Sequence, residues 1–144
     1  MCTSFSNPLK RIARSLPLLL AAMVAHAEKL ELQDRDVIAF MGGTTMVQAM
    51  ESGYLECLLT HHHPALNLRF RDFSWEADTV YAQATVSERW RRSAFGDLEK
   101  QLRAAGTTLA VLHFGQMECL QGPAGLDAFR TRYGTLIEQV KRVT

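Results

Sequence analysis

The stretch that decides the fold is DVIAFMGGTT, residues 36–45. Its centre, residues 37–41, is a short run of apolar side chains, which is typical of a buried strand. Gly42 and Gly43 follow at once, and a glycine pair marks a turn. The stretch therefore predicts a buried strand that ends in a tight turn.

A helix is expected after this turn. Between residues 45 and 60, apolar side chains recur at steps of three and four, which is the stripe of one amphipathic helix. Thr44 lies where an N-cap belongs. The helix is expected to end at the histidines before Pro64, because the residue that precedes a proline avoids the α region. An alternating segment at 67–73 then predicts a second strand.

The second half of the chain repeats the alternation of strand and helix. Residues 95–105 are helical up to Gly106, residues 107–114 predict a third strand that ends at Gly115, and Gly122-Pro123 opens a last helix. Such alternation implies an α/β fold with a parallel sheet and crossover connections. The simplest arrangement places the first strand in the middle, in the order 2-1-3. Ligands of such sheets bind beyond the carboxyl ends of the strands, where loops 42–45 and 115–118 are expected to meet.

Length and composition bound the kind of protein. The chain has 144 residues, 47% of them hydrophobic, which suits one globular domain. Its net charge of +1 argues against a protein that coats nucleic acid. Three cysteines are too few for a disulfide scaffold, although Cys57 and Cys119 could pair in an oxidising compartment. The sequence holds no uninterrupted apolar run of about 18 residues, so no stable membrane span is expected.

Residues 1–27 have the features of a secretory signal peptide. Lys10, Arg11 and Arg14 form a basic opening, an apolar run follows at 16–25, and Ala25-His26-Ala27 has the form of a cleavage site. Cleavage there leaves a domain of residues 28–144 in a secreted or periplasmic protein. The alternative is an uncleaved anchor in the membrane interface.

The loops and strand ends carry a family resemblance. Four stretches contribute to it: VIAFMGGT at 37–44, GYLE at 53–56, RFRDFSWEADTV at 69–80, and FGQMECL with GPAGL at 114–126. In this order and spacing, the segment 36–140 resembles the SGNH or GDSL hydrolases, which are esterases and lipases, and most closely a divergent, planctomycete-like branch. The resemblance implies a three-layer, flavodoxin-like SGNH fold with helices on both faces of the sheet, here C-terminally short.

The resemblance also implies roles for individual residues. Thr44 stands at the position of the nucleophilic serine, and the alternative is that it only caps the helix. Ala77 matches a glycine whose backbone N–H points into the oxyanion hole. Met117 stands where the family has an asparagine donor, and a thioether has no hydrogen to donate. No residues after Val140 fit the Asp-x-x-His block that supplies the base. The loops of this expected site include Gly42, Gly43, Gly115 and Glu118.

These altered blocks set the functional expectation. The resemblance implies an exported ester hydrolase that acts on acyl or acetyl esters of carbohydrate or lipid, with no cofactor, and the altered positions predict weak or no activity. The alternatives are a non-catalytic binding or scaffolding domain, or a fragment of a longer protein. A small sheet of this kind can also expose an edge that a partner chain covers.

Several other groups of residues are candidate sites. The run His61-His62-His63 does not predict a metal site, because adjacent helical side chains point in different directions and no converging ligands follow. His113 and Cys119 are conceivable as a Cys–His nucleophile. Asp78 and Glu118 are the acids nearest the expected site, and both are expected in solvated loops. A basic patch with one aromatic side chain lies at 89–92 and comprises Arg89, Trp90, Arg91 and Arg92. It could bind an anion, and the alternative is a stretch of solvated side chains.

Overall fold

A computed structural model describes residues 30–81 and 96–144 of the chain. Residues 31–144 form one compact unit, and the account below concerns that unit. The expected signal peptide and the patch around Trp90 lie outside the described residues. Among the described residues, no helix has both the length and the apolar character that a bilayer crossing requires.

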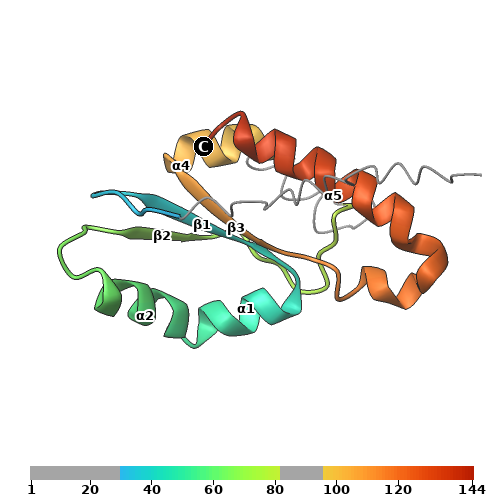
Figure 1. Cartoon of the computed structure of the whole chain (residues 1–144), viewed down its shortest axis with the longest axis horizontal. Helices are drawn as coiled ribbons and strands as arrows, with labels where there is room; N and C mark the ends of the chain where they lie inside the picture. The colour runs from blue at the N-terminus through green and yellow to red at the C-terminus, as the bar shows by residue number, and fades with distance from the viewer. Residues whose placement is uncertain (1–29, 82–95) are drawn as a thin grey trace, which may run out of the picture. The chain divides into compact units, whose positions relative to one another are not determined.

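A three-stranded parallel sheet forms the centre of the unit. Strand β1 (Val37–Gly42) lies between β2 (Arg69–Asp72) and β3 (Leu109–His113). The register places Phe40 beside Asp72 on one side and beside Val111 on the other. The predicted strands, their parallel pairing and the order 2-1-3 are therefore confirmed, and the α/β architecture is visible in Figure 1.

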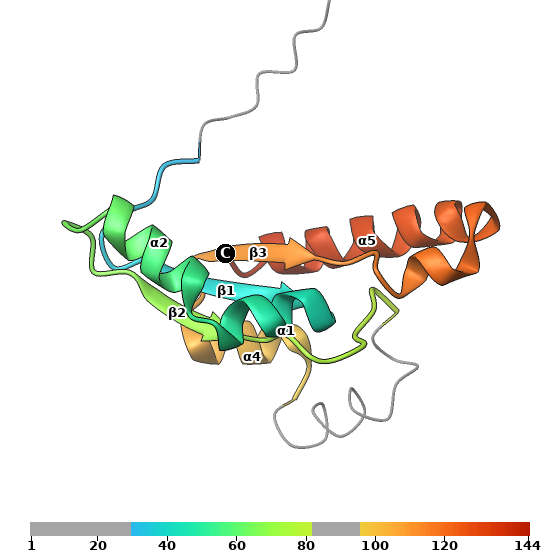
Figure 2. The ribbon, with the colours of Figure 1, turned by 90° about the horizontal axis from the view of Figure 1, so that it is seen from below.

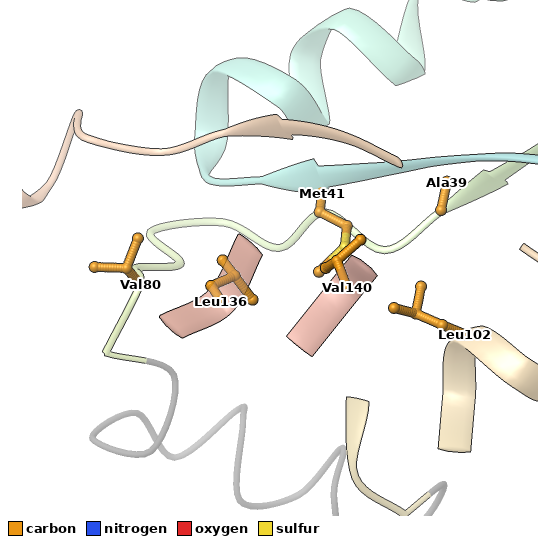
Figure 3. Packing of buried hydrophobic residues seen from close by; sticks show 6 residues of the cluster. All are labelled: Ala39, Met41, Val80, Leu102, Leu136 and Val140. Carbon is orange, nitrogen blue, oxygen red and sulfur yellow. The ribbon is translucent and has the colours of Figure 1, made fainter. Parts of the chain in front are cut away.

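Strand β1 supplies both halves of the core. All six of its residues are buried, and their side chains alternate between the two faces of the sheet. Ile38 and Phe40 pack in a cluster with Met46, whereas Ala39 and Met41 pack in a second cluster. That second cluster, which Figure 3 shows from close by, is completed by four residues: Val80, Leu102, Leu136 and Val140.

Two pairs of helices cover the two faces of the sheet. Helices α1 (Thr44–Glu51) and α2 (Tyr54–His62) lie on one side, and α4 (Leu98–Ala105) and α5 (Leu126–Lys141) lie on the other (Figure 1). Asp97 caps α4 by accepting a hydrogen bond from the Lys100 N–H at 2.9 Å, and Gly106 ends it as predicted, with a φ of 68°. Two short 3-10 turns, η1 (Glu118–Gln121) and η2 (Pro123–Gly125), precede α5.

The single helix expected at 45–60 is wrong in one respect, because the chain breaks it into α1 and α2. The break lies at Ser52 and Gly53, and Gly53 has a left-handed conformation with a φ of 64°. Glycine adopts this conformation without steric cost, and the Ser52 hydroxyl donates to the Ala49 carbonyl at 2.8 Å. The apolar spacing continues across the break, so the pattern alone does not reveal it. The predicted end before Pro64 is confirmed, since α2 ends at His62.

Candidate functional site

Three loops meet beyond the carboxyl ends of the strands. They comprise the loop after β1, the segment 73–81 after β2, and the segment 114–118 after β3, as Figure 2 shows. The Thr45 hydroxyl donates to Gln116 Oε1 at 2.9 Å, which joins the first loop to the third. The predicted meeting of loops 42–45 and 115–118 is therefore confirmed.

The segment after β2 continues along β1 and then crosses its end. The Phe73 N–H donates to the Phe40 carbonyl at 2.8 Å, and the Trp75 N–H donates to the Gly42 carbonyl at 3.0 Å. The close approach explains Gly43, because a Cβ atom at that position would lie 3.1 Å from the Asp78 carbonyl oxygen. Glycine at this position therefore lets the 73–81 segment approach the end of β1 closely.

This crossing brings Ala77 to Thr44. The Ala77 N–H donates to Thr44 Oγ1 at 3.0 Å, although the two residues are 33 positions apart. Ala77 has a left-handed backbone with a φ of 56°, which is uncommon for a residue with a Cβ atom. The N-cap position of α1 belongs to Gly43, and Thr44 is the first helical residue. The interpretation of Thr44 as a helix cap is therefore wrong. Its hydroxyl instead accepts a hydrogen bond from the segment 73–81.

The chemistry available to Thr44 follows from these partners. A hydroxyl becomes a useful nucleophile when a base within hydrogen-bond distance takes its proton. In residues 30–81 and 96–144, no histidine or carboxylate is hydrogen-bonded to the Thr44 hydroxyl. Met117 is half-buried at the start of η1 and brings no donor. The arrangement thus combines a hydroxyl and a backbone N–H without a base.

Glu118 is the group that the sequence reading placed wrongly. Its side chain is buried, with 6% of the residue exposed, rather than solvated in a loop. Oε1 accepts from the Val80 N–H at 2.7 Å, and Oε2 accepts from the Gly115 N–H at 3.0 Å. One carboxylate therefore ties the segment 73–81 to the loop after β3. The sequence carries no signal for this burial, because the apolar neighbours Cys119 and Leu120 are themselves exposed.

Asp78 lies beside this junction. It is half-buried, its side chain accepts from the Thr79 N–H at 2.9 Å, and its own N–H donates to the Trp75 carbonyl at 3.1 Å. These local bonds close the turn that carries Ala77 toward Thr44. Asp78 thus helps to shape the segment 73–81.

A pocket of about 470 Å³ adjoins Glu118. It is lined by residues of the two 3-10 turns and of the start of α5, which follow β3 in the chain. Its walls are mostly apolar and include Pro123, Leu126 and Phe129, with Cys119 and Glu118 beside them. The sequence reading missed this pocket because packing of turns against a helix creates it, and no local motif encodes it.

The cysteines and histidines make no shared site in the described part of the chain. Cys57 and Cys119 are both free and exposed, so the possible bridge between them is not formed. The Cys119 thiol donates to the Gln116 carbonyl at 2.9 Å rather than to His113, whose side chain is exposed. The described residues contain no group of three or more histidine, cysteine or acidic side chains that could hold a metal ion.

Burial and the charge of Glu118 affect the ionisation of Tyr133. Tyr133 is half-buried, and its ring lies 5.4 Å from the ring of Phe129, measured between the ring centres. Its hydroxyl donates to the Leu112 carbonyl at 3.2 Å. Burial raises the pKa of the Tyr133 phenol above its ordinary value, and the negative charge of Glu118 raises the pKa further. The neutral phenol is thus the form that the folded protein favours.

We expect this shift to appear in the alkaline stability of the protein. Because the folded state holds the phenol proton more tightly, the stabilisation is complete below the unfolded pKa near 10 and is lost as pH rises through the higher folded value. Urea unfolding between pH 8 and pH 11 should therefore show a decline that Tyr133→Phe flattens. Tyr54→Phe is the control, since Tyr54 is 64% exposed, and it should leave the decline unchanged. An equal decline in Tyr133→Phe and in the unmodified protein would contradict the assignment.

Comparisons with protein-family models, with curated proteins and with solved structures found no match for this chain.

Proposed function

We propose that the chain is an exported, SGNH-like domain with the flavodoxin-like layering of that family, whose site derives from an ester hydrolase and turns esters over weakly or not at all. The observation that carries this proposal is the 3.0 Å hydrogen bond from the Ala77 N–H to Thr44 Oγ1. The resemblance assigns these two positions, far apart in sequence, to the nucleophile and to an oxyanion donor. Both groups must lie beside the same reacting carbon in such a site, and the hydrogen bond brings them next to each other.

The same geometry argues for a low rate. Loss of one oxyanion donor costs a factor of roughly 10²–10³, and Met117 offers no side-chain donor. Loss of a triad base costs a factor of about 10⁴ or more, and no base is hydrogen-bonded to Thr44 among the described residues. The substrate class that the resemblance implies is an acyl or acetyl ester of a carbohydrate or lipid.

A non-catalytic binding domain is the second candidate. It is favoured by the fact that the Ala77 N–H is occupied by Thr44 and thus is not free to receive an oxyanion. In that case the carboxyl edge of the sheet would bind a ligand without cleaving it.

Hydrolysis of a chromogenic acetyl ester tests the proposal. We expect slow release of the chromogenic alcohol, which Thr44→Ala removes and Thr60→Ala, at an exposed threonine of α2, leaves in place. Thr44→Ala deletes one hydrogen-bond acceptor and should cost about 1 kcal/mol of stability, which thermal unfolding measures separately. Met117→Asn should raise kcat/KM by about 10-fold or more, because it restores a donor. Thr44→Ser should help less, because it adds no donor and no base.

The outcomes separate the two candidates. Complete absence of turnover in the unmodified protein and in Met117→Asn would favour the binding domain. Robust turnover that survives Thr44→Ala would overturn the site assignment.

A further inference from the structure

We infer that the pocket beside Glu118 binds a neutral aliphatic molecule, one hydrocarbon chain with an uncharged head group. This role is independent of ester hydrolysis, because the pocket contains neither Thr44 nor Ala77.

The walls fit a small apolar ligand. A pocket of about 470 Å³ lies within the range of about 300–1,000 Å³ that is usual for ligand sites, and such sites are mostly apolar with a few polar groups. Phe129 and Leu126 supply apolar surface from the first turns of α5, and Pro123 supplies more from η2. Leu126 remains 44% exposed, so apolar surface there stays in contact with water until a ligand covers it.

Glu118 decides the charge of the ligand. Among the described residues that line the pocket it is the one charged side chain, and it is buried. Both of its oxygens accept backbone N–H bonds, and the pKa of the neighbouring Tyr133 is raised in part by its negative charge. A second anion in the pocket would be repelled by this charge, and the described residues of the lining include no cation to offset it. An alcohol therefore fits better than the carboxylate of the same chain length.

Cys119 provides a reporter at this pocket. Its thiol is exposed and lines the pocket, so a bound chain should shield it from an alkylating reagent. Cys57 is exposed as well, and it belongs to α2 on the opposite face of the sheet from α5 (Figure 1). The Cys119 thiol therefore reports on the pocket, and the Cys57 thiol, which is remote from it, serves as the internal control.

The test alkylates the full chain with iodoacetamide at pH 8 and follows each cysteine by peptide mass. With 1-octanol near its solubility limit, the rate at Cys119 should fall at least 3-fold and the rate at Cys57 should stay constant. Octanoate at the same concentration should protect Cys119 less than 1.5-fold. Equal rates at Cys119 with and without octanol would overturn the pocket as a binding site. Equal protection by octanoate would overturn the neutral ligand class.

Three variants sharpen the result. Leu126→Trp fills the pocket and should abolish the octanol effect, whereas Leu58→Trp, at a leucine 37% exposed on α2, should retain it. Thermal unfolding checks that both variants fold. Glu118→Gln removes the charge and should let octanoate protect Cys119 as well as octanol does. If Glu118→Gln fails to fold, the unmodified protein still decides the matter through the octanol and octanoate arms.

Discussion

Replacing Glu118 by alanine is expected to lower the free energy of unfolding by about 3 kcal/mol, since each buried donor left without a partner costs about 1–3 kcal/mol. The two donors are the N–H groups of Val80 and Gly115, which the carboxylate receives at 2.7 and 3.0 Å. Val80 belongs to the segment 73–81, and its side chain is buried in the core (Figure 3). Urea unfolding at pH 7 measures the loss.

Matched variants separate this effect from the general loss of a charge. Glu118→Gln keeps one acceptor oxygen and should cost less than the alanine variant. Glu138→Ala removes an exposed glutamate that pairs with Lys141 at 3.1 Å on the surface of α5, and it should change stability by less than about 1 kcal/mol. If Glu118→Ala proves as mild as Glu138→Ala, the carboxylate does not hold the two loops together.

Gly42→Ala is expected to cost about 3 kcal/mol, at the upper end of what overpacking of a core usually costs. A Cβ atom on Gly42 would lie 2.3 Å from the His113 carbonyl oxygen and 3.0 Å from Met46 Cβ. The first of these is backbone of the neighbouring strand, so no side-chain rotation relieves the contact. β1 and β3 would have to separate at their carboxyl ends, which also displaces Thr44.

Gly134→Ala, in contrast, should stabilise the protein. Gly134 lies exposed within α5, and a Cβ atom there meets nothing within 4 Å. Alanine in a helix interior is more stable than glycine by about 0.5–1 kcal/mol, so this variant should melt at a higher temperature. Thermal unfolding of both glycine variants in parallel gives the comparison. A Gly42→Ala protein as stable as the unmodified one would show that the strand ends have room to move.

Much of the fold could be predicted from the sequence, because it follows from local patterns. The apolar run before Gly42 marks the buried strand, Gly106 ends α4 through its left-handed conformation, and Pro64 limits α2. Helices separate the three strands, and crossover connections between parallel strands are almost always right-handed, so few arrangements of the sheet are possible. The order 2-1-3 is the simplest of them. The meeting of loops 42–45 and 115–118 follows from that order alone.

What the tertiary structure decided concerns contacts between residues far apart in the chain. Whether Thr44 caps its own helix or accepts from Ala77 depends on where the segment 73–81 crosses, and sequence spacing does not fix that path. Glu118 is buried and joins two loops, instead of being solvated, because two backbone N–H groups donate to its oxygens. One of these groups belongs to a residue 38 positions away. A backbone N–H has no sequence signature, since almost every residue carries one. Its position in space, which only the packed fold determines, therefore decides where a polar side chain finds its partner.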